Sequence, residues 1–194
     1  MTQKLITLTG KPMLPPAWSL GYHQCRWNYL TQEELIEVNE NMTKHDIPCD
    51  TVWLDIEYSD AKRYFTWDKK KFKEPRKMLE NIVGHERRLV TIIDPHVKFD
   101  EDFFLYKQAT ERGVLVQNSE KETYHGRCWP ETSAWVDFFN PKSLELKKIL
   151  YNTVPKDWIN FEEKDYIWAD PNVGIWIDMN EPACFEKTDK TMSK

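Results

Sequence analysis

The chain has 194 residues, of which 40% are hydrophobic and 30% charged, and its net charge at pH 7 is −5. This composition is typical of a soluble globular protein of one domain with enough apolar mass for a core. Acidic and basic residues are interspersed, which argues against a nucleic-acid-binding surface, and no apolar run approaches the length of a membrane span.

Strand-like and helix-like segments alternate along the chain, which favours an α/β fold with a parallel sheet. Residues 1–15 are predicted to be a lead-in segment that precedes the fold. The first half then gives, in order, a strand over 17–22, a helix that Thr31 caps and His45 ends, a strand over 51–55, a small hairpin within 64–68, and a helix from Pro75 to Gly84.

Three of the four predicted strands end in an aspartate, namely Asp55, Asp94 and Asp178. Because the carboxyl ends of parallel strands lie on one rim, we expect these carboxylates to share a site. The second half of the chain gives, in order, a strand over 89–94, a helix over 101–112, an extended excursion over 114–139, a helix over 142–151 and a strand over 173–178.

Four β/α units supply roughly half of a (β/α)8 barrel, which takes about 250 residues. An open, doubly wound sheet of four strands is the alternative architecture, and it would also gather the strand ends in one crevice. No glycine-rich phosphate loop follows the first predicted strand, which argues against a nucleotide-binding version of that alternative.

The four cysteines form no C-x-x-C pair, so the sequence predicts free thiols rather than a zinc site or a disulfide scaffold. Asp94 and His96 are two potential metal ligands without a third, and we expect no metal. The first residues, from Met1 to Lys4, lack the apolar core of a signal peptide.

The most informative stretch is V-G-I-W-I-D-M-N-E-P, over residues 173–182. It places Asp178 at the end of a buried strand, where barrel enzymes carry their catalytic groups. The string resembles the nucleophile signature of glycoside hydrolase family 31, the α-glucosidase family. The resemblance continues through most of the chain, in the blocks 14–29, 53–57, 62–68, 94–96, 128–130 and 137–138.

This resemblance implies that residues 16–194 are the N-terminal half of the catalytic barrel of a retaining, exo-acting α-glucosidase that uses no cofactor. Asp178 would be its nucleophile, since a carboxylate of a retaining glycosidase bonds covalently to the sugar. Asn180 and Glu181 would orient Asp178 or line its pocket, with a structural role as the alternative for either. The substrate-binding residues would be Trp27, Asp55, Ile56, Ile92, Asp94, Trp129, Trp176 and Met179, with capping, bracing or core packing as the alternatives.

The family often carries a small residue where Glu131 stands, so the entrance loop is expected to differ here. The family's acid/base aspartate, a substrate-binding arginine and a later pocket histidine belong to strands beyond the fourth. We therefore expect the 194-residue chain alone not to hydrolyse α-glucosides, and the chemistry to require the remainder of the parent catalytic domain. The alternative is a catalytically inactive carbohydrate-binding fragment or a truncated gene product.

Within the family, these blocks are most similar to the glucosidase II α subunits and the neutral α-glucosidases. This similarity implies that the substrate is α-linked glucose on oligosaccharides or N-glycans, and that the glucosidase II β subunit is a partner. It also implies the lumen of the endoplasmic reticulum as the compartment. The cytoplasm is the alternative, because this chain shows no signal peptide.

Overall fold

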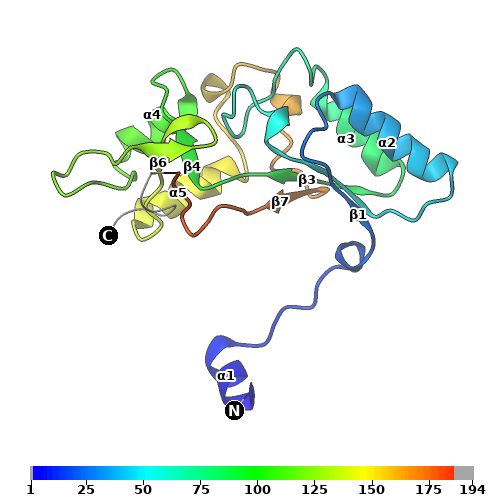
Figure 1. The fold of residues 1–194 in the computed structure, drawn as a ribbon, viewed down its shortest axis with the longest axis horizontal. Helices are drawn as coiled ribbons and strands as arrows, with labels where there is room; N and C mark the ends of the chain where they lie inside the picture. The colour runs from blue at the N-terminus through cyan, green and yellow to red at the C-terminus, as the bar shows by residue number, and fades with distance from the viewer. Residues whose placement is uncertain (1, 186–194) are drawn as a thin grey trace.

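A computed structural model of the chain describes residues 2–185. Its centre is a parallel sheet of four strands in the order β1–β2–β3–β7, and the helices after β1 and β2 lie together on one face of it (Figure 1). The predicted α/β fold with a parallel sheet is confirmed. The elements are β1 (His23–Gln24), α2 (Gln32–Lys44), β2 (Thr51–Leu54), α3 (Pro75–Gly84), β3 (Arg88–Ile92) and β7 (Val173–Trp176).

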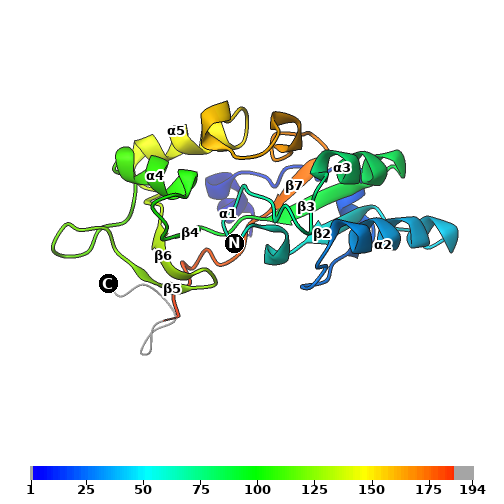
Figure 2. The ribbon, with the colours of Figure 1, turned by 90° about the horizontal axis from the view of Figure 1, so that it is seen from above.

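A smaller antiparallel sheet, in the order β4–β6–β5, is inserted between β3 and β7 and lies to one side of the main sheet (Figure 2). β5 and β6 lie in the segment that the sequence predicts to be an extended excursion without a helix, and that prediction is confirmed for residues 114–139, whereas β4 comes earlier in the chain. The elements of this region are β4 (His96–Lys98), α4 (Phe104–Glu111), β5 (Gly126–Cys128), β6 (Glu131–Trp135) and α5 (Pro141–Leu150).

The lead-in predicted over residues 1–15 contains one helix, α1 (Thr2–Thr9). Figure 1 shows α1 at the end of an extended segment that leads away from the sheet. The side chains described within it are exposed.

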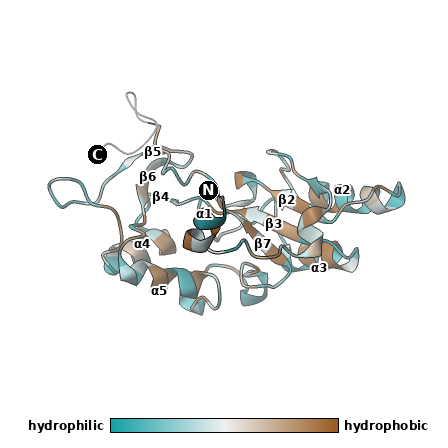
Figure 3. Ribbon diagram, turned by 90° about the horizontal axis from the view of Figure 1, so that it is seen from below, coloured by the Kyte–Doolittle hydropathy of each residue, from teal (hydrophilic) through white to brown (hydrophobic). Residues whose placement is uncertain are grey.

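The two faces of β2 differ in burial because side chains alternate along a strand. Val52 and Leu54 of β2 are fully buried beneath the helices, whereas Trp53 between them is only half-buried. The side chain of Trp53 contacts His23 and Trp176, with ring centroids 5.7 and 5.3 Å apart, and so continues an aromatic row on the face opposite the helices. Figure 3 shows the apolar segments concentrated along the central strands, with polar loops at the periphery.

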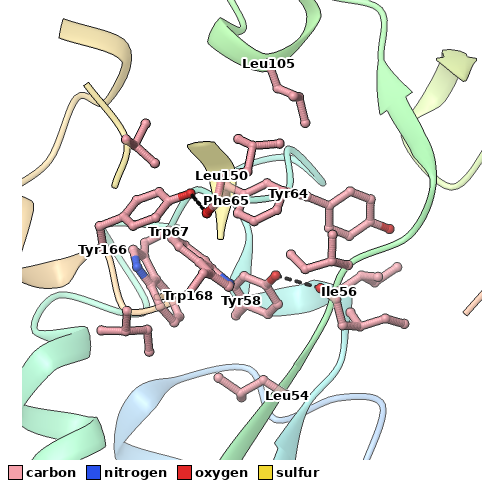
Figure 4. Close-up of a cluster of buried hydrophobic side chains, with 14 of the residues drawn as sticks. Leu54, Ile56, Tyr58, Tyr64, Phe65, Trp67, Leu105, Leu150, Tyr166 and Trp168 are labelled. Atoms are coloured by element: carbon pink, nitrogen blue, oxygen red, sulfur yellow. Dashed lines mark hydrogen bonds between the residues drawn. The ribbon is translucent and has the colours of Figure 1, made fainter. Parts of the chain in front are cut away.

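A cluster of buried aromatic side chains lies beside the sheet and fixes the loop that follows β2 (Figure 4). Trp67 packs 5.1 Å from Tyr58 and 5.0 Å from Trp168, centroid to centroid. Two of these rings are anchored by a hydrogen bond: Tyr58 donates to the carbonyl of Ile92 at 2.7 Å, and Trp67 donates to the carbonyl of Asp165 at 2.9 Å. Because these contacts join segments far apart in sequence, the loop after β2 is held against the end of β3.

The predicted helices are all present, with boundaries within three residues of the expected ones. Thr31 caps the helix as predicted, because its Oγ1 accepts from the amide of Glu34 at 3.2 Å. The carboxylate of Glu34 accepts from the amide of Leu30 at 2.6 Å, whereas in a capping box it would accept from the amide of Thr31. The helix predicted over 101–112 begins later, at Phe104.

The strand predicted over 17–22 is wrong. Residues Ala17–Leu20 form a 3-10 turn, in which the side chain of Ser19 donates to the carbonyl of Pro16 at 2.8 Å. The strand starts at His23, where pairing with Thr51 of β2 first becomes available. Just before that point the chain passes so close to Asp50 that a Cβ atom on Gly21 would overlap the Asp50 carboxylate.

The hairpin predicted within 64–68 is also wrong. This segment is a loop with one isolated bridge, between Asp60 and Arg63. Tyr64, Phe65 and Trp67 are all at least 98% buried, whereas the alternation of a hairpin would turn neighbouring side chains to opposite faces. Phe65 achieves this with a left-handed backbone, φ 61°.

Candidate active site

The three predicted aspartates lie on one rim of the main sheet. Asp55 follows β2 directly, while Asp94 and Asp178 each stand two residues beyond the end of their strand. β3 and β7 stop together, because Ile92 is the register partner of Trp176. By the alternation of side chains, all three aspartates belong to the face of the sheet opposite the helices.

A cavity of about 330 Å³ opens at this rim. Its volume falls at the lower end of the range for small-molecule sites, about 300–1,000 Å³. Seven of the eight side chains that line it were selected from the sequence, and they come from the ends of β1, β2, β3 and β7 and from the loop after β5. The lining consists of Trp27, Asp55, Ile56, Lys62, Ile92, Trp129, Asp178 and Met179.

The remaining predicted residues lie outside this cavity. Trp176 packs edge-on against Trp53 in the aromatic row. Asp94 and Asn180 line a neighbouring cavity of about 80 Å³, and Asn180 also donates from its side chain to the backbone carbonyl of Asp178. Glu181 is exposed. The structure thus brings together most of the predicted sugar pocket, while the role of each residue stays a prediction.

Asp55 is half-buried at the start of a 3-10 turn, η2 (Ile56–Tyr58). One carboxylate oxygen accepts from the amide of Ile56 at 2.7 Å. Burial raises the pKa of Asp55, this hydrogen bond opposes the shift, and the charges of Glu57 and Asp178 add to it. The last contribution shows that Asp55 and Asp178 interact electrostatically across the cavity.

Asp94 is only 5% exposed, and its carboxylate interacts electrostatically with Asp55 and Asp178 of the larger cavity. Burial raises its pKa to about 6; the hydrogen bond from Tyr64 opposes this shift, and the charges of Asp178 and Asp55 reinforce it. Oδ2 accepts the hydrogen bond that the Tyr64 hydroxyl donates, whereas Oδ1 has no hydrogen-bond partner among the described residues. A buried acceptor without a partner is costly, so Oδ1 is the unsatisfied atom of this carboxylate.

Lys62 is the lining residue that sequence reasoning missed. Its ammonium donates to the carbonyl of Trp129 at 3.1 Å, across 67 positions of sequence. Ala61 and Lys62 both adopt left-handed backbones, φ 47° and 63°, and Lys98 donates to the carbonyl of Ala61 at 2.9 Å. Lys62 stands inside a block that resembles the family, but no motif or periodicity distinguishes it from a solvated surface lysine.

Within residues 2–185, no group of three His, Cys, Asp or Glu side chains is placed to hold a metal ion. Over the same residues, no helix is both long and apolar enough to cross a membrane. All four cysteines are free thiols; Cys128 and Cys184 are buried, and Cys25 is exposed.

Parallel strands with crossover helices, and carboxylates gathered where those strands end, fit a β/α barrel and also an open doubly wound sheet. A comparison with protein families decides for the barrel: the model described as the glycosyl hydrolases family 31 TIM-barrel domain matches residues 12–194. The chain belongs to this family. The prediction of the N-terminal part of a (β/α)8 barrel is therefore confirmed, and the open doubly wound sheet is excluded.

The curated relatives support the family assignment. The chain is 42% identical over 188 residues to the glucosidase 2 subunit alpha of Schizosaccharomyces pombe, covering 96% of this chain and 19% of the relative. It is 41% identical over 189 residues to the neutral alpha-glucosidase AB of Homo sapiens, covering 97% of this chain and 19% of the relative. The chain thus spans about a fifth of the length of these relatives.

Solved structures agree in fold. A glucosidase II alpha subunit in its DNJ-bound form matches with a TM-score of 0.85 and 40% identity, over 95% of this chain and 19% of that one. An ER glucosidase II heterodimer of the catalytic subunit and the binding domain of the regulatory subunit matches with a TM-score of 0.81 and 40% identity, over 90% and 18%. A family 31 dextranase of Flavobacterium johnsoniae matches with a TM-score of 0.79 and 27% identity, over 96% of this chain and 21% of that one.

Proposed function

We propose that the chain is the nucleophile-bearing part of the catalytic barrel of a retaining exo-α-glucosidase. The observation that carries the proposal is the 330 Å³ cavity, which Asp55 and Asp178 share with two tryptophan side chains. Carboxylates beside flat apolar rings suit a pyranose, whose hydroxyl groups donate to the carboxylates while its apolar face packs on the rings.

In this mechanism Asp178 attacks the anomeric carbon and the glycosidic bond to the leaving group breaks, which leaves a covalent glycosyl-enzyme that water then hydrolyses. Asp178 is exposed and lines the cavity, so its carboxylate can reach the sugar. Asp55 accepts hydrogen bonds from sugar hydroxyls instead. Retention also requires a protonated acid beside the leaving group, and we assign that group to the part of the catalytic domain outside residues 2–185.

The test is covalent labelling of the full-length protein encoded by the gene. A cyclitol epoxide or an activated fluorosugar of the α-gluco configuration should inactivate it, and peptide mapping should find the label on Asp178. The matched control is Asp55→Asn, which keeps the nucleophile and should still be labelled, more slowly. A label on Asp55 or Asp94 would overturn the assignment.

The substrate, partner and compartment extend this proposal. We propose terminal α-linked glucose on oligosaccharides or N-glycans as the substrate, supported by similarity to glucosidase II alpha subunits. A regulatory β subunit is the proposed partner, since a similar chain is described in such a heterodimer. The endoplasmic reticulum follows as the compartment, with the cytoplasm as its alternative. Co-purification of a β subunit with the tagged full-length protein, and release of glucose from glucosylated N-glycans, test these points.

A further inference from the structure

Three buried polar side chains run from Asp94 into the small antiparallel sheet, and the proposed mechanism does not use them. Tyr64 comes from the loop after β2, His96 from β4 and Cys128 from β5. They are 1%, 0% and 3% exposed, respectively. Buried polar groups of this kind are retained only where their hydrogen bonds are satisfied, so the pattern of contacts among them is informative.

The contacts form a single line. Tyr64 Oη donates to Asp94 Oδ2 and lies 3.2 Å from His96 Nε2. On the other side of the imidazole, His96 Nδ1 lies 3.3 Å from Cys128 Sγ. His96 Nε2 also lies 3.6 Å from Asp94 Oδ2. Cys128, His96, Tyr64 and Asp94 are thus connected without a gap.

The direction of the protons along this line follows from the number of donors. The single proton of Tyr64 goes to Asp94, so Tyr64 Oη can only accept from His96. Both neighbours of His96 Nε2 are then acceptors, which places the proton of the neutral imidazole on Nε2. Burial lowers the pKa of His96 to about 3, so the ring is neutral. Nδ1 is left as an acceptor.

Cys128 supplies the proton that Nδ1 requires. Burial raises the pKa of Cys128 to about 12, so it is a thiol and not a thiolate. Its alternative acceptor, the carbonyl of Ala183, is farther away, at 3.7 Å against 3.3 Å. A thiol is a weak donor, but it is sufficient to select one tautomer of a buried histidine.

We propose that Cys128, His96 and Tyr64 are positioning residues that act through one directed chain of hydrogen bonds to hold Asp94 as an acceptor for the substrate. The chain occupies Oδ2 of Asp94 and leaves Oδ1 without a partner among the described residues. Oδ1 is then the atom that accepts from a sugar hydroxyl. This inference rests on the proposed function, because it assumes that a sugar in the 330 Å³ cavity extends to Asp94, which lines the neighbouring cavity of about 80 Å³.

The test is a double-mutant cycle in the full-length protein, measured as kcat/KM on a p-nitrophenyl α-glucoside. Tyr64→Phe removes the donor to Asp94 and should lower kcat/KM by about tenfold or more, the effect of losing a hydrogen bond to a charged group. Cys128→Ala should lower it by about two- to tenfold. The contact between His96 Nε2 and Asp94 Oδ2, at 3.6 Å, is too long for a hydrogen bond, so Cys128 reaches Asp94 by hydrogen bonds only through His96 and Tyr64. Cys128→Ala should therefore have no further effect in the Tyr64→Phe background.

A matched control separates positioning from packing. Cys184 is 0% exposed and belongs to the same apolar cluster as Cys128, but it contacts Tyr124 and lies outside the chain of hydrogen bonds. Cys184→Ala should lower the melting temperature about as much as Cys128→Ala while leaving kcat/KM unchanged, and Cys128→Ser should restore kcat/KM.

Two outcomes would overturn this inference and leave the proposed function standing. One is a double variant whose loss of kcat/KM equals the product of the losses in Tyr64→Phe and Cys128→Ala. The other is a loss of kcat/KM in Cys184→Ala as large as that in Cys128→Ala. Either can arise in a protein whose labelling at Asp178 still supports the proposed function. A full-length wild-type protein with no activity on α-glucosides would overturn both proposals.

Discussion

The two faces of the main sheet are built from the same strands, but on β2 they differ in how deeply their side chains are buried and in the residues that they present. On β2, Val52 and Leu54 are fully buried under the helices, while Trp53 and Asp55 alternate with them on the half-open face. The helix-covered face supplies apolar burial, at about 25 cal/mol per Å². The opposite face ends in carboxylates, and burial, with a smaller contribution from their mutual charges, raises the pKa of Asp55 and Asp94. On β2, fully buried apolar side chains thus lie on one face, and the candidate site residue lies on the other.

Substitutions at neighbouring positions of one strand should therefore separate the two properties. A change on the helix-covered face should cost stability and spare the chemistry of the folded fraction. A change at the rim should do the reverse, and removal of a buried rim charge should even stabilise the protein, because functional sites commonly conflict with stability.

The largest effect is expected for Asp178→Asn in the full-length protein. Asp178 is exposed and its side chain is proposed to form the covalent intermediate, so turnover should fall by at least about a thousandfold while the melting temperature stays unchanged. Steady-state kinetics and thermal unfolding of the same preparation measure the two. A variant that keeps more than a tenth of the wild-type turnover would contradict the role of Asp178.

Leu54→Ala is the matching change on the helix-covered face. Leu54 is 0% exposed, and truncation of a buried leucine costs about 2–5 kcal/mol of the free energy of unfolding. Denaturant unfolding should show this loss, while kcat per folded molecule should remain at the wild-type value. A large fall in kcat of the folded fraction would mean that the two faces are coupled.

The fold was predictable where one local signal decided the structure. The strands β2, β3 and β7, the Thr31 helix cap and the Pro75 helix start all follow from side chains and their immediate neighbours. Two elements failed because their signals are not local. The first strand begins only where β2 can pair with it, and the loop around Phe65 is shaped by aromatic partners that come about 100 positions later.

The site was predictable to a similar extent. A strand-end aspartate can be located from the sequence, and the resemblance to a family selected seven of the eight residues that line the cavity. Lys62 and the Cys128–His96–Tyr64 chain could not be found in this way. Their importance depends on contacts across 32 to 67 positions, and no spacing in the sequence encodes such contacts.

Asp94→Asn tests whether the buried charge of a rim carboxylate lowers the stability of the fold. The pKa of Asp94 is raised from 3.8 to about 6, so the folded state binds this proton more tightly than the unfolded state. The charged carboxylate therefore destabilises the fold increasingly between pH 4 and 6, and by a constant amount above that range. At 1.36 kcal/mol per pKa unit this amounts to about 3 kcal/mol.

Asp94→Asn should thus raise the melting temperature at pH 7, lose this advantage near pH 4, and lower kcat/KM for α-glucosides. Thermal unfolding of both proteins across this pH range provides the measurement. Equal melting temperatures at pH 7 would show that burial of the Asp94 charge carries no penalty.

The smallest effect is expected for Lys62→Met, which tests whether the rim depends on contacts between loops. The ammonium of Lys62 ties the loop after β2 to the carbonyl of Trp129, and both residues line the cavity. Loss of one such hydrogen bond, worth about 0.5–1.5 kcal/mol, should loosen the Trp129 wall and raise KM by about two- to tenfold with little change in kcat. Lys69→Met is the control, since that lysine bonds the carbonyl of Asn160 in another exposed loop, away from the cavity lining. If Lys62→Met lowered kcat and left KM unchanged, Lys62 would act in the transition state, and its place would be with the catalytic carboxylates instead of the wall.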